Sequence, residues 1–201
     1  MKNLLFLFAT VLTLSCCSKD DTTPQDKLPE ATTTGANTAG CYINGELLVP
    51  KNAPLDFTSG PKSYGLTTGA GNNFHPPIIG DDYKYIRITN LKDKGGDFIY
   101  LQVNNMEKGA GIYTIDQSNN EFFMDGPNNA HVIVQTFDGV NLGKVFLSGP
   151  NAGTITYTRF DYPNGIYSGT FNLIVYNKDN PNETIKITDG RFDIGLGTLN
   201  Q

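Results

Sequence analysis

Two histidines and three cysteines are the residues in this chain best suited to a metal site or a nucleophilic centre. His75 and His131 are far apart, and the chain has neither a His-x-x-x-His nor a Cys-x-x-Cys pair. Zinc sites rely on such closely spaced ligands, so the sequence predicts no metal site and no cofactor. We expect solvent-facing or structural roles for both histidines.

Acidic and hydroxyl side chains are the second group that can do catalytic chemistry. Asp81 and Asp82 adjoin Gly80 in an expected loop, and consecutive side chains diverge where the backbone is extended. A glycoside hydrolase needs two carboxylates that converge on one bond. Ser168 precedes an expected strand, and the chain lacks the Gly-x-Ser-x-Gly motif. No catalytic residue is therefore assigned, although composition leaves a Ser-His-Asp triad open.

Residues 116–120 and 179–183 have the alternating oxygen side chains of calcium loops. Both segments lack the glycine and the distal acid that complete such a loop. The glycine pairs at 109–111 and 195–197 do not open a helix after a strand, so they do not predict a phosphate site. All four segments are interpreted as turns.

The first residues are typical of an export signal. Lys2 precedes an apolar run from Leu4 to Leu14, which is too short for a membrane-spanning helix of about 20 residues. We therefore expect residues 1–16 to be a signal peptide. Cys41 is distant from the other two cysteines and lies in an expected strand that runs into a turn, so it is predicted to be a buried structural thiol.

The residues Leu14-Ser15-Cys16-Cys17 resemble the lipobox of bacterial lipoproteins, in which a cysteine is acylated and becomes the new N-terminus. Cleavage before Cys17 places Leu14 favourably, whereas cleavage before Cys16 places Ser15 favourably. The next residues, Ser-Lys-Asp-Asp, are similar to the start of many Bacteroidetes lipoproteins displayed on the cell surface. The resemblance implies lipidation of Cys17, with Cys16 as the alternative, and attachment to the outer membrane facing the cell surface.

The net charge and the expected lipid indicate which partners the protein can bind. The formal net charge is −5 at pH 7, which disfavours nucleic acid and anionic lipid surfaces. Each buried acyl CH₂ contributes about 0.8 kcal/mol, so two or more chains hold a protein firmly on a bilayer. The expected membrane contact is therefore the N-terminal lipid.

Residues 17–37 are predicted to form a disordered tether. Ser, Thr, Asp and Pro dominate this stretch, which is too poor in apolar residues to bury a core of its own. A flexible coil of roughly 20 residues reaches about 25 Å. Asp21-Thr22-Thr23 is similar to the acceptor used in Bacteroidetes O-glycosylation, which implies a glycan on Thr22.

From residue 38 to residue 201 the pattern is that of one antiparallel β domain. The chain has 201 residues, 17% of them charged, with 22 Gly and 11 Pro, which argues against helical bundles and coiled coils. Apolar residues alternate with polar ones in several runs, and turn clusters separate the runs. We expect nine or ten strands in a β-sandwich or a barrel-like sheet. The alternating or apolar runs are 85–89, 98–103, 132–134, 145–147, 171–175, 185–187 and 192–194.

Two connections carry specific expectations. Asn164-Gly165 predicts a hairpin, because both residues tolerate a positive φ. The segment from Pro50 to Asp82 is rich in Pro and Gly and predicts a long loop around an early strand near Tyr64–Thr68. Long loops on rigid β scaffolds are frequent binding surfaces.

Several blocks resemble a family of uncharacterised Bacteroidetes lipoproteins. The first is Thr-Gly-Ala-Asn-Thr-Ala-Gly-Cys, residues 34–41, followed by an Asn-Gly turn. Later blocks are Gly-Ile-Tyr-Thr at 111–114, Ser-Gly-Thr-Phe at 168–171 and the segment 187–193. The match spans about residues 34–194, and Ala39 stands where the family has Phe. The family has no known function, so the resemblance implies no substrate and no catalytic residue.

The sequence predicts an exported, lipid-anchored protein that is most simply a non-catalytic binding module for an extracellular glycan or peptide. Its 10 Tyr and 12 Phe can stack on sugars, although Trp is absent. The alternatives are a hydrolase of envelope polymers and a structural envelope component. Acids converging in a cleft would favour the hydrolase, an exposed aromatic row would favour binding, and a uniformly polar surface would favour the structural component.

Overall fold

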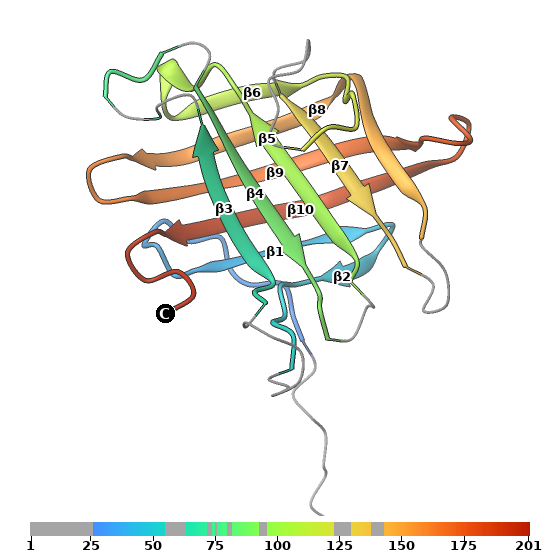
Figure 1. Ribbon diagram of the computed structural model, residues 1–201, viewed down its shortest axis with the longest axis horizontal. Helices are drawn as coiled ribbons and strands as arrows, with labels where there is room; N and C mark the ends of the chain where they lie inside the picture. The colour runs from blue at the N-terminus through green and yellow to red at the C-terminus, as the bar shows by residue number, and fades with distance from the viewer. Residues whose placement is uncertain are drawn as a thin grey trace, which may run out of the picture.

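The structure is a computed structural model that describes residues 26–54, 63–71, 74, 76–79, 82–92, 96–122, 130–137 and 143–201. These residues form an all-β domain of ten strands and one 3₁₀ turn, which confirms the predicted fold class (Figure 1). No helix in this part of the chain has the length and apolar character needed to cross a bilayer.

The elements follow one another as β1 (Thr38–Ile43), β2 (Glu46–Leu48), β3 (Leu66–Gly71), β4 (Tyr83–Thr89), β5 (Phe98–Val103), η1 (Met106–Lys108), β6 (Gly111–Ile115), β7 (His131–Gln135), β8 (Val145–Asp161), β9 (Ile166–Asn177) and β10 (Thr184–Gly195).

All strands belong to one antiparallel sheet that curls into a half-barrel. The strand order is β2-β1-β10-β9-β8-β7-β5-β4-β3, and β6 pairs with the second half of β8. The sheet changes direction at β8, because the first residues of β8 pair with β7 and its later residues pair with β6. A register shift against β9 between Ser148 and Gly153 separates the two halves.

Two layers face each other across the core. In Figure 1 the front layer of β3, β4, β5 and β7 crosses the back layer of β8, β9, β10 and β1. Alternate residues of both layers point inward, as period-two patterning requires. Ile86 and Leu101 of the front layer and Phe171 and Ile187 of the back layer belong to one buried cluster. A second, smaller cluster on the other face of the front layer holds Phe98, Tyr100, Ile133 and Leu147.

The predicted runs all lie in strands, and several local expectations are confirmed. Residues 185–187 and 192–194 belong to one strand, β10, which has a bulge where Asp189 adopts a φ of 54°. The hairpin at Asn164-Gly165 joins β8 to β9, but of this pair only Gly165 has a positive φ, at 65°. The early strand begins at Leu66, two residues later than expected.

Part of the segment predicted as a tether is held against the domain. Residues 26–37 are described, and Thr32, Thr34, Gly35 and Ala36 all hydrogen-bond to the carboxylate of Asp193 in β10. This segment is poor in apolar residues, and polar contacts hold it instead. Besides the bonds to Asp193, Arg191 donates to the Pro29 carbonyl oxygen and the Gly195 amide donates to the Asn37 side chain. Cys16, Cys17, Thr22 and the rest of residues 1–25 lie outside the described residues.

Candidate functional site

Lys84 is a buried cation on the core-facing side of β4. It shares this face with Ile86 and Ile88, and the three residues are 2%, 1% and 0% exposed. Its partners across the ladder are Ala70 of β3 and Val103 of β5. Ala70 has only a methyl group, so space remains beside the lysine on the side of the edge strand.

A pocket of about 430 Å³ occupies that space. The Lys84 ammonium nitrogen lies 3.9 Å from the ring centroid of Tyr167 and 5.6 Å from that of Phe74. Aromatic rings and one cation therefore dominate the walls. The lining residues are Thr68, Gly69, Ala70, Phe74, Lys84, Tyr162, Tyr167 and Leu196.

Burial lowers the pKa of Lys84 from its ordinary 10.5 to about 8. No ion pair of the described residues includes Lys84, and the aromatic rings are its electrostatic partners. At pH 7 the side chain is still mostly protonated. A buried cation without a counter-ion is unfavourable, and an anion that enters the pocket would relieve that cost.

The tyrosines of the pocket are neutral hydrogen-bonding groups. Burial, reinforced by the nearby Tyr162 and Asp161, raises the pKa of Tyr167 to about 12. The Tyr162 hydroxyl donates to the carbonyl oxygen of Phe74 at 3.0 Å, which ties two walls of the pocket together. Both hydroxyls keep oxygen lone pairs that can accept further hydrogen bonds.

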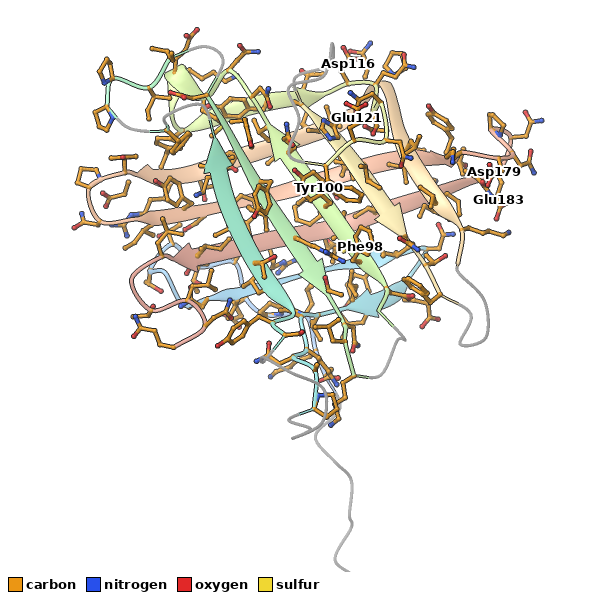
Figure 2. All side chains as sticks on the ribbon, in the orientation of Figure 1. Phe98, Tyr100, Asp116, Glu121, Asp179 and Glu183 are labelled. Atoms are coloured by element: carbon orange, nitrogen blue, oxygen red, sulfur yellow. The ribbon has the colours of Figure 1, made fainter. Side chains whose placement is uncertain are left out.

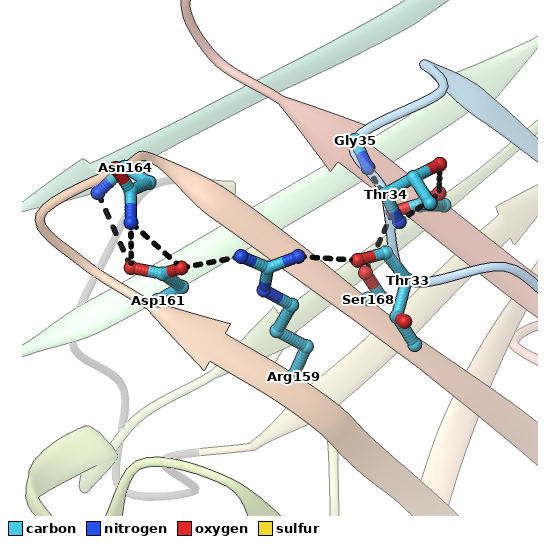
Figure 3. Close-up of polar contacts among 8 residues, drawn as sticks. Thr33, Thr34, Gly35, Arg159, Asp161, Asn164 and Ser168 are labelled. Carbon is cyan, nitrogen blue, oxygen red and sulfur yellow. Dashed lines mark hydrogen bonds and ion pairs between the residues drawn. The ribbon is translucent and has the colours of Figure 1, made fainter.

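The loop that carries Tyr162 is braced from both sides (Figure 3). The Asp161 carboxylate accepts hydrogen bonds from Arg159 at 2.5 Å and from the Asn164 side chain at 3.0 Å. These two residues hold the pKa of Asp161 below its ordinary value. Arg159 also donates to the Thr33 carbonyl oxygen at 2.6 Å. The pocket wall is thereby fixed to the N-terminal segment.

Asp193 is a second buried charge, and its environment is the opposite of that of Lys84. Besides the N-terminal residues already described, the Ser168 hydroxyl donates to it at 2.6 Å. Burial opposes ionisation, but the hydrogen bonds from Ser168, Thr32, Ala36 and Gly35 outweigh it and hold the pKa of Asp193 well below its ordinary value. We call this arrangement the Asp193 clasp.

The serine and histidine candidates do not come together. Ser168 is bound to Asp193, and the nucleophile-activating histidine of a triad is not part of that contact. His131 lies buried at the start of β7, with Nε2 3.1 Å from the Glu121 carbonyl oxygen. Cys41 is fully buried, and burial raises the pKa of its thiol to about 12. His75 lies outside the described residues.

The acidic candidates are occupied by turn geometry. Asp82 is buried; its Oδ2 accepts a hydrogen bond from the Ile79 amide at 2.9 Å, and its Oδ1 is buried without a hydrogen-bond partner among the described residues. Asp81 is not described. Asp116 accepts from the Gln117 amide at 2.9 Å, within one of the two calcium-like segments. Figure 2 labels Asp116 and Glu121 at one end of the molecule and Asp179 and Glu183 at the β9–β10 loop.

A second pocket, of about 340 Å³, lies between the β1–β2 hairpin and the β9–β10 loop and is lined partly by Asp97, Lys144 and Glu183. Lys144 forms an ion pair with Glu183 at 2.6 Å, and the Asp97 carboxylate accepts a hydrogen bond from the Phe137 amide at 2.6 Å. Among the described residues, no group of three His, Cys, Asp or Glu side chains is placed to hold a metal ion. We take the Lys84 pocket as the candidate site, because a buried cation lies at its wall.

Sequence reasoning did not single out Lys84, although a signal was present. In the alternation of residues 84–88 the lysine has the same parity as Ile86 and Ile88, so it belongs to the apolar face. A lysine in that register predicts either a strand end or a buried charge. The predicted loop region of residues 50–82 did contain part of the site, since Thr68, Ala70 and Phe74 line the pocket.

Comparison with known proteins adds no relative. No family model, no curated protein and no solved structure matches the chain.

Proposed function

We propose that this protein is a lipid-anchored binding module of the bacterial cell surface, and that its ligand, an extracellular glycan or peptide, places an anionic group in the Lys84 pocket. The observation that carries the proposal is the buried, uncompensated ammonium group of Lys84 at the wall of a cavity. The anchor rests on Cys17, or Cys16 as the alternative, and on the apolar run before it.

The energetic argument starts from what Lys84 costs the fold. Its pKa is about 8 when buried and 10.5 ordinarily, a difference worth about 3 kcal/mol against folding at neutral pH. A methionine at this position would avoid the cost. A residue that destabilises a fold at a cavity wall is characteristic of a functional site, where stability and function are in conflict.

The chemistry of the pocket selects the ligand. A carboxylate would pair with the ammonium group, and the rings of Phe74 and Tyr167 would contact the less polar body that carries it. A pocket of about 430 Å³ is within the range of small-molecule sites. Neutral tyrosine hydroxyls can complete the polar contacts. The expected role is therefore ligand recognition, and the proposal assigns no general acid or base.

Long-range electrostatics would not assist binding. The formal net charge of −5 repels anions, but this repulsion is screened beyond a Debye length of about 8 Å at physiological salt. Attraction to Lys84 must therefore act at contact distance, inside the cavity. We expect added salt to leave the affinity for an acidic ligand unchanged or to raise it slightly, unlike binding to an exposed basic patch.

Binding is tested with the full-length chain, expressed in a host that processes lipoproteins and extracted in detergent. It is screened against arrays of bacterial and host glycans and of peptides, together with Lys84→Met and the control Lys186→Met, which removes an exposed lysine of β10. We expect ligands whose binding is lost in Lys84→Met and kept in Lys186→Met. Ligands that bind both variants equally would overturn the assignment of the pocket.

The anchor is tested separately by mass spectrometry of the N-terminal peptide and by protease shaving of intact cells. We expect an acyl mass on Cys17 and release of the domain by the protease. An unmodified N-terminus in the soluble fraction would overturn the lipoprotein assignment and leave the pocket untouched.

A further inference from the structure

The N-terminal segment is fastened to the domain from Asp26 onward. The Asp26 carboxylate forms an ion pair with Lys51, which lies just after β2. Further along the segment, the Pro29 carbonyl oxygen accepts a hydrogen bond from Arg191 at 3.2 Å. The Asp193 clasp then holds the residues that follow. Asp26 is therefore a fixed point on the surface of the domain, and any connection to a membrane starts there.

This fixed point lies at one end of the front layer. The Lys51 amide donates to the Thr89 carbonyl oxygen at 3.0 Å, and the Lys51 carbonyl oxygen accepts a hydrogen bond from the Leu91 amide at 3.0 Å. Lys51 is thus joined to the end of β4, and the exposed residue Lys92 follows directly. We call Asp26, Lys51 and Lys92 the basal end. Figure 1 shows β2, the start of β3 and the end of β4 in the lower part of the molecule, and β6 in the upper part.

The opposite end of the domain and the pocket are both far from the basal end. Strand β4 has seven residues, and a strand rises about 3.3 Å per residue, so its first residue lies about 20 Å from its last. Lys84 is the second residue of β4 and therefore lies near the far end. The turn η1 follows the end of β5 that pairs with the beginning of β4, which places the exposed residue Glu107 at the far end too.

The connection between the expected lipid and the basal end is short. Eight residues, 18–25, separate Cys17 from Asp26. The links from Cys17 to Asp26 span at most about 32 Å when fully extended, and acylation of Cys16 instead adds about 3.6 Å. A domain with η1 toward the bilayer would need most of this length to bring the chain past its own height. Extension of every residue costs about 1–2 kcal/mol of conformational entropy per residue. A domain with the basal end toward the bilayer avoids this cost.

We propose that the basal end faces the lipid bilayer, so that β3 and β4 extend away from the membrane and the Lys84 pocket lies about 20 Å farther out. This inference rests on the lipid anchor of the proposed function. The partner of the basal end is the headgroup layer of the membrane, because the anchored chain meets the domain there. The pocket is then held away from the bilayer, on the side from which a glycan or a peptide would approach.

Energy transfer to labelled lipids measures this orientation. The full-length protein, with its acylated cysteine identified by mass spectrometry, is inserted into phosphatidylcholine vesicles that carry an acceptor dye on their outer headgroups. A donor dye is attached to the variant Lys92→Cys or to the variant Glu107→Cys. Cys41 is fully buried and should remain unlabelled, and Cys17→Ser is added if Cys16 is the acylated residue. We expect greater transfer from position 92, equivalent to a distance from the headgroups that is about 20 Å shorter.

A longer connection is the matched control. Insertion of about 20 Gly and Ser residues directly before Asp26 gives a flexible connection whose reach exceeds the height of the domain. The lipid, the folded domain and both dye positions stay the same in this variant. Because the longer chain lets the domain turn over the bilayer, we expect the difference between positions 92 and 107 to shrink toward zero. The same comparison excludes attraction of the dye itself to the membrane, which the insertion would leave unchanged.

The outcomes distinguish this inference from the function on which it rests. Equal transfer from the two positions with the natural connection, or greater transfer from position 107, would overturn the orientation while the lipid anchor stands. A difference that persists after the insertion would overturn the length of the connection as its cause. An N-terminus without an acyl chain would overturn the anchor and the orientation together. The assignment of the Lys84 pocket depends on none of these results.

Discussion

Asp193 and Lys84 are both charged side chains buried in the same half-barrel, but the groups that surround them differ. Asp193 accepts hydrogen bonds from the side chains of Ser168 and Thr32 and from backbone amides of the N-terminal segment. Lys84 meets two aromatic rings. A buried charge surrounded by donors joins parts of a fold together. A buried charge without such partners lowers stability and is available to a ligand.

The largest expected effect is the loss of the clasp. Asp193→Asn keeps the shape of the side chain but turns an amide N–H toward groups that are themselves donors. Because hydrogen bonds to a charged group contribute about 1.5–3 kcal/mol each, we expect the free energy of unfolding to fall by about 3–5 kcal/mol. Urea denaturation at pH 7 measures the change.

The control for this variant is Asp189→Asn, an exposed residue of the same strand whose φ of 54° suits asparagine equally well. It should shift stability by less than about 0.5 kcal/mol. The folded-state pKa of Asp193 lies below its unfolded value of about 3.9, so its contribution is present above that pH and is lost as the pH falls. The two variants should therefore converge in strong acid, and a difference that persists there would contradict the electrostatic account.

Lys84→Met should have the opposite sign. Methionine has a similar length and needs no solvation, so we expect the free energy of unfolding at pH 7 to rise by up to about 3 kcal/mol. Denaturation at pH 7 is the measurement, with Lys186→Met as the exposed control. A lower stability than wild type would mean that the ammonium group is better satisfied in the fold than its contacts indicate.

The pH dependence of stability in alkaline solution tests the environment of Lys84 in the wild-type protein. Between pH 8 and 10.5 the unfolded chain keeps the Lys84 proton while the folded chain has released it. Stability rises with pH where the unfolded state binds more protons, so the Lys84 contribution should improve by up to about 3 kcal/mol across this window. The difference between wild type and Lys84→Met, measured by urea denaturation at several pH values, should shrink in step. A constant difference would place the pKa of Lys84 near its ordinary value.

Some strands could be predicted from the sequence and others could not. Strands such as β4, β5 and β9 were predictable because their apolar residues alternate over a full strand, as in Phe171, Leu173 and Val175. The second half of β8 was not predicted, because its pattern mixes Thr and Tyr and is interrupted by register shifts. Local periodicity identifies a strand only where one face is uniformly apolar.

The partners of neither buried charge could be recognised from its sequence neighbours. Asp193 meets partners about 160 residues earlier in the chain, such as Thr32, for which the sequence separation is 161. Composition suggested that the N-terminal segment has too little apolar surface to fold, and the clasp holds it by other means. Lys84 has the correct parity for the core, but the rings that surround it come from Phe74 in a loop and Tyr167 in β9. Pairing across such distances becomes visible only in the folded chain.

The smallest expected effect comes from removing one hydrogen bond of the Asp193 clasp. It tests how strongly the clasp holds the N-terminal segment against the domain. Thr32→Val removes one donor, at 2.6 Å, and keeps the shape of the side chain, while the Asp193 carboxylate retains its bonds to Gly35, Ala36 and Ser168. We expect a loss of about 1–2 kcal/mol, confined to the segment that Thr32 belongs to. Hydrogen exchange should therefore quicken at the amides of residues 32–36 and stay unchanged in β9, because opening of the segment does not require unfolding of the sheet. If exchange quickened equally throughout, the segment would be an integral part of the fold; if it quickened nowhere, residues 26–37 would be fastened by contacts other than the clasp.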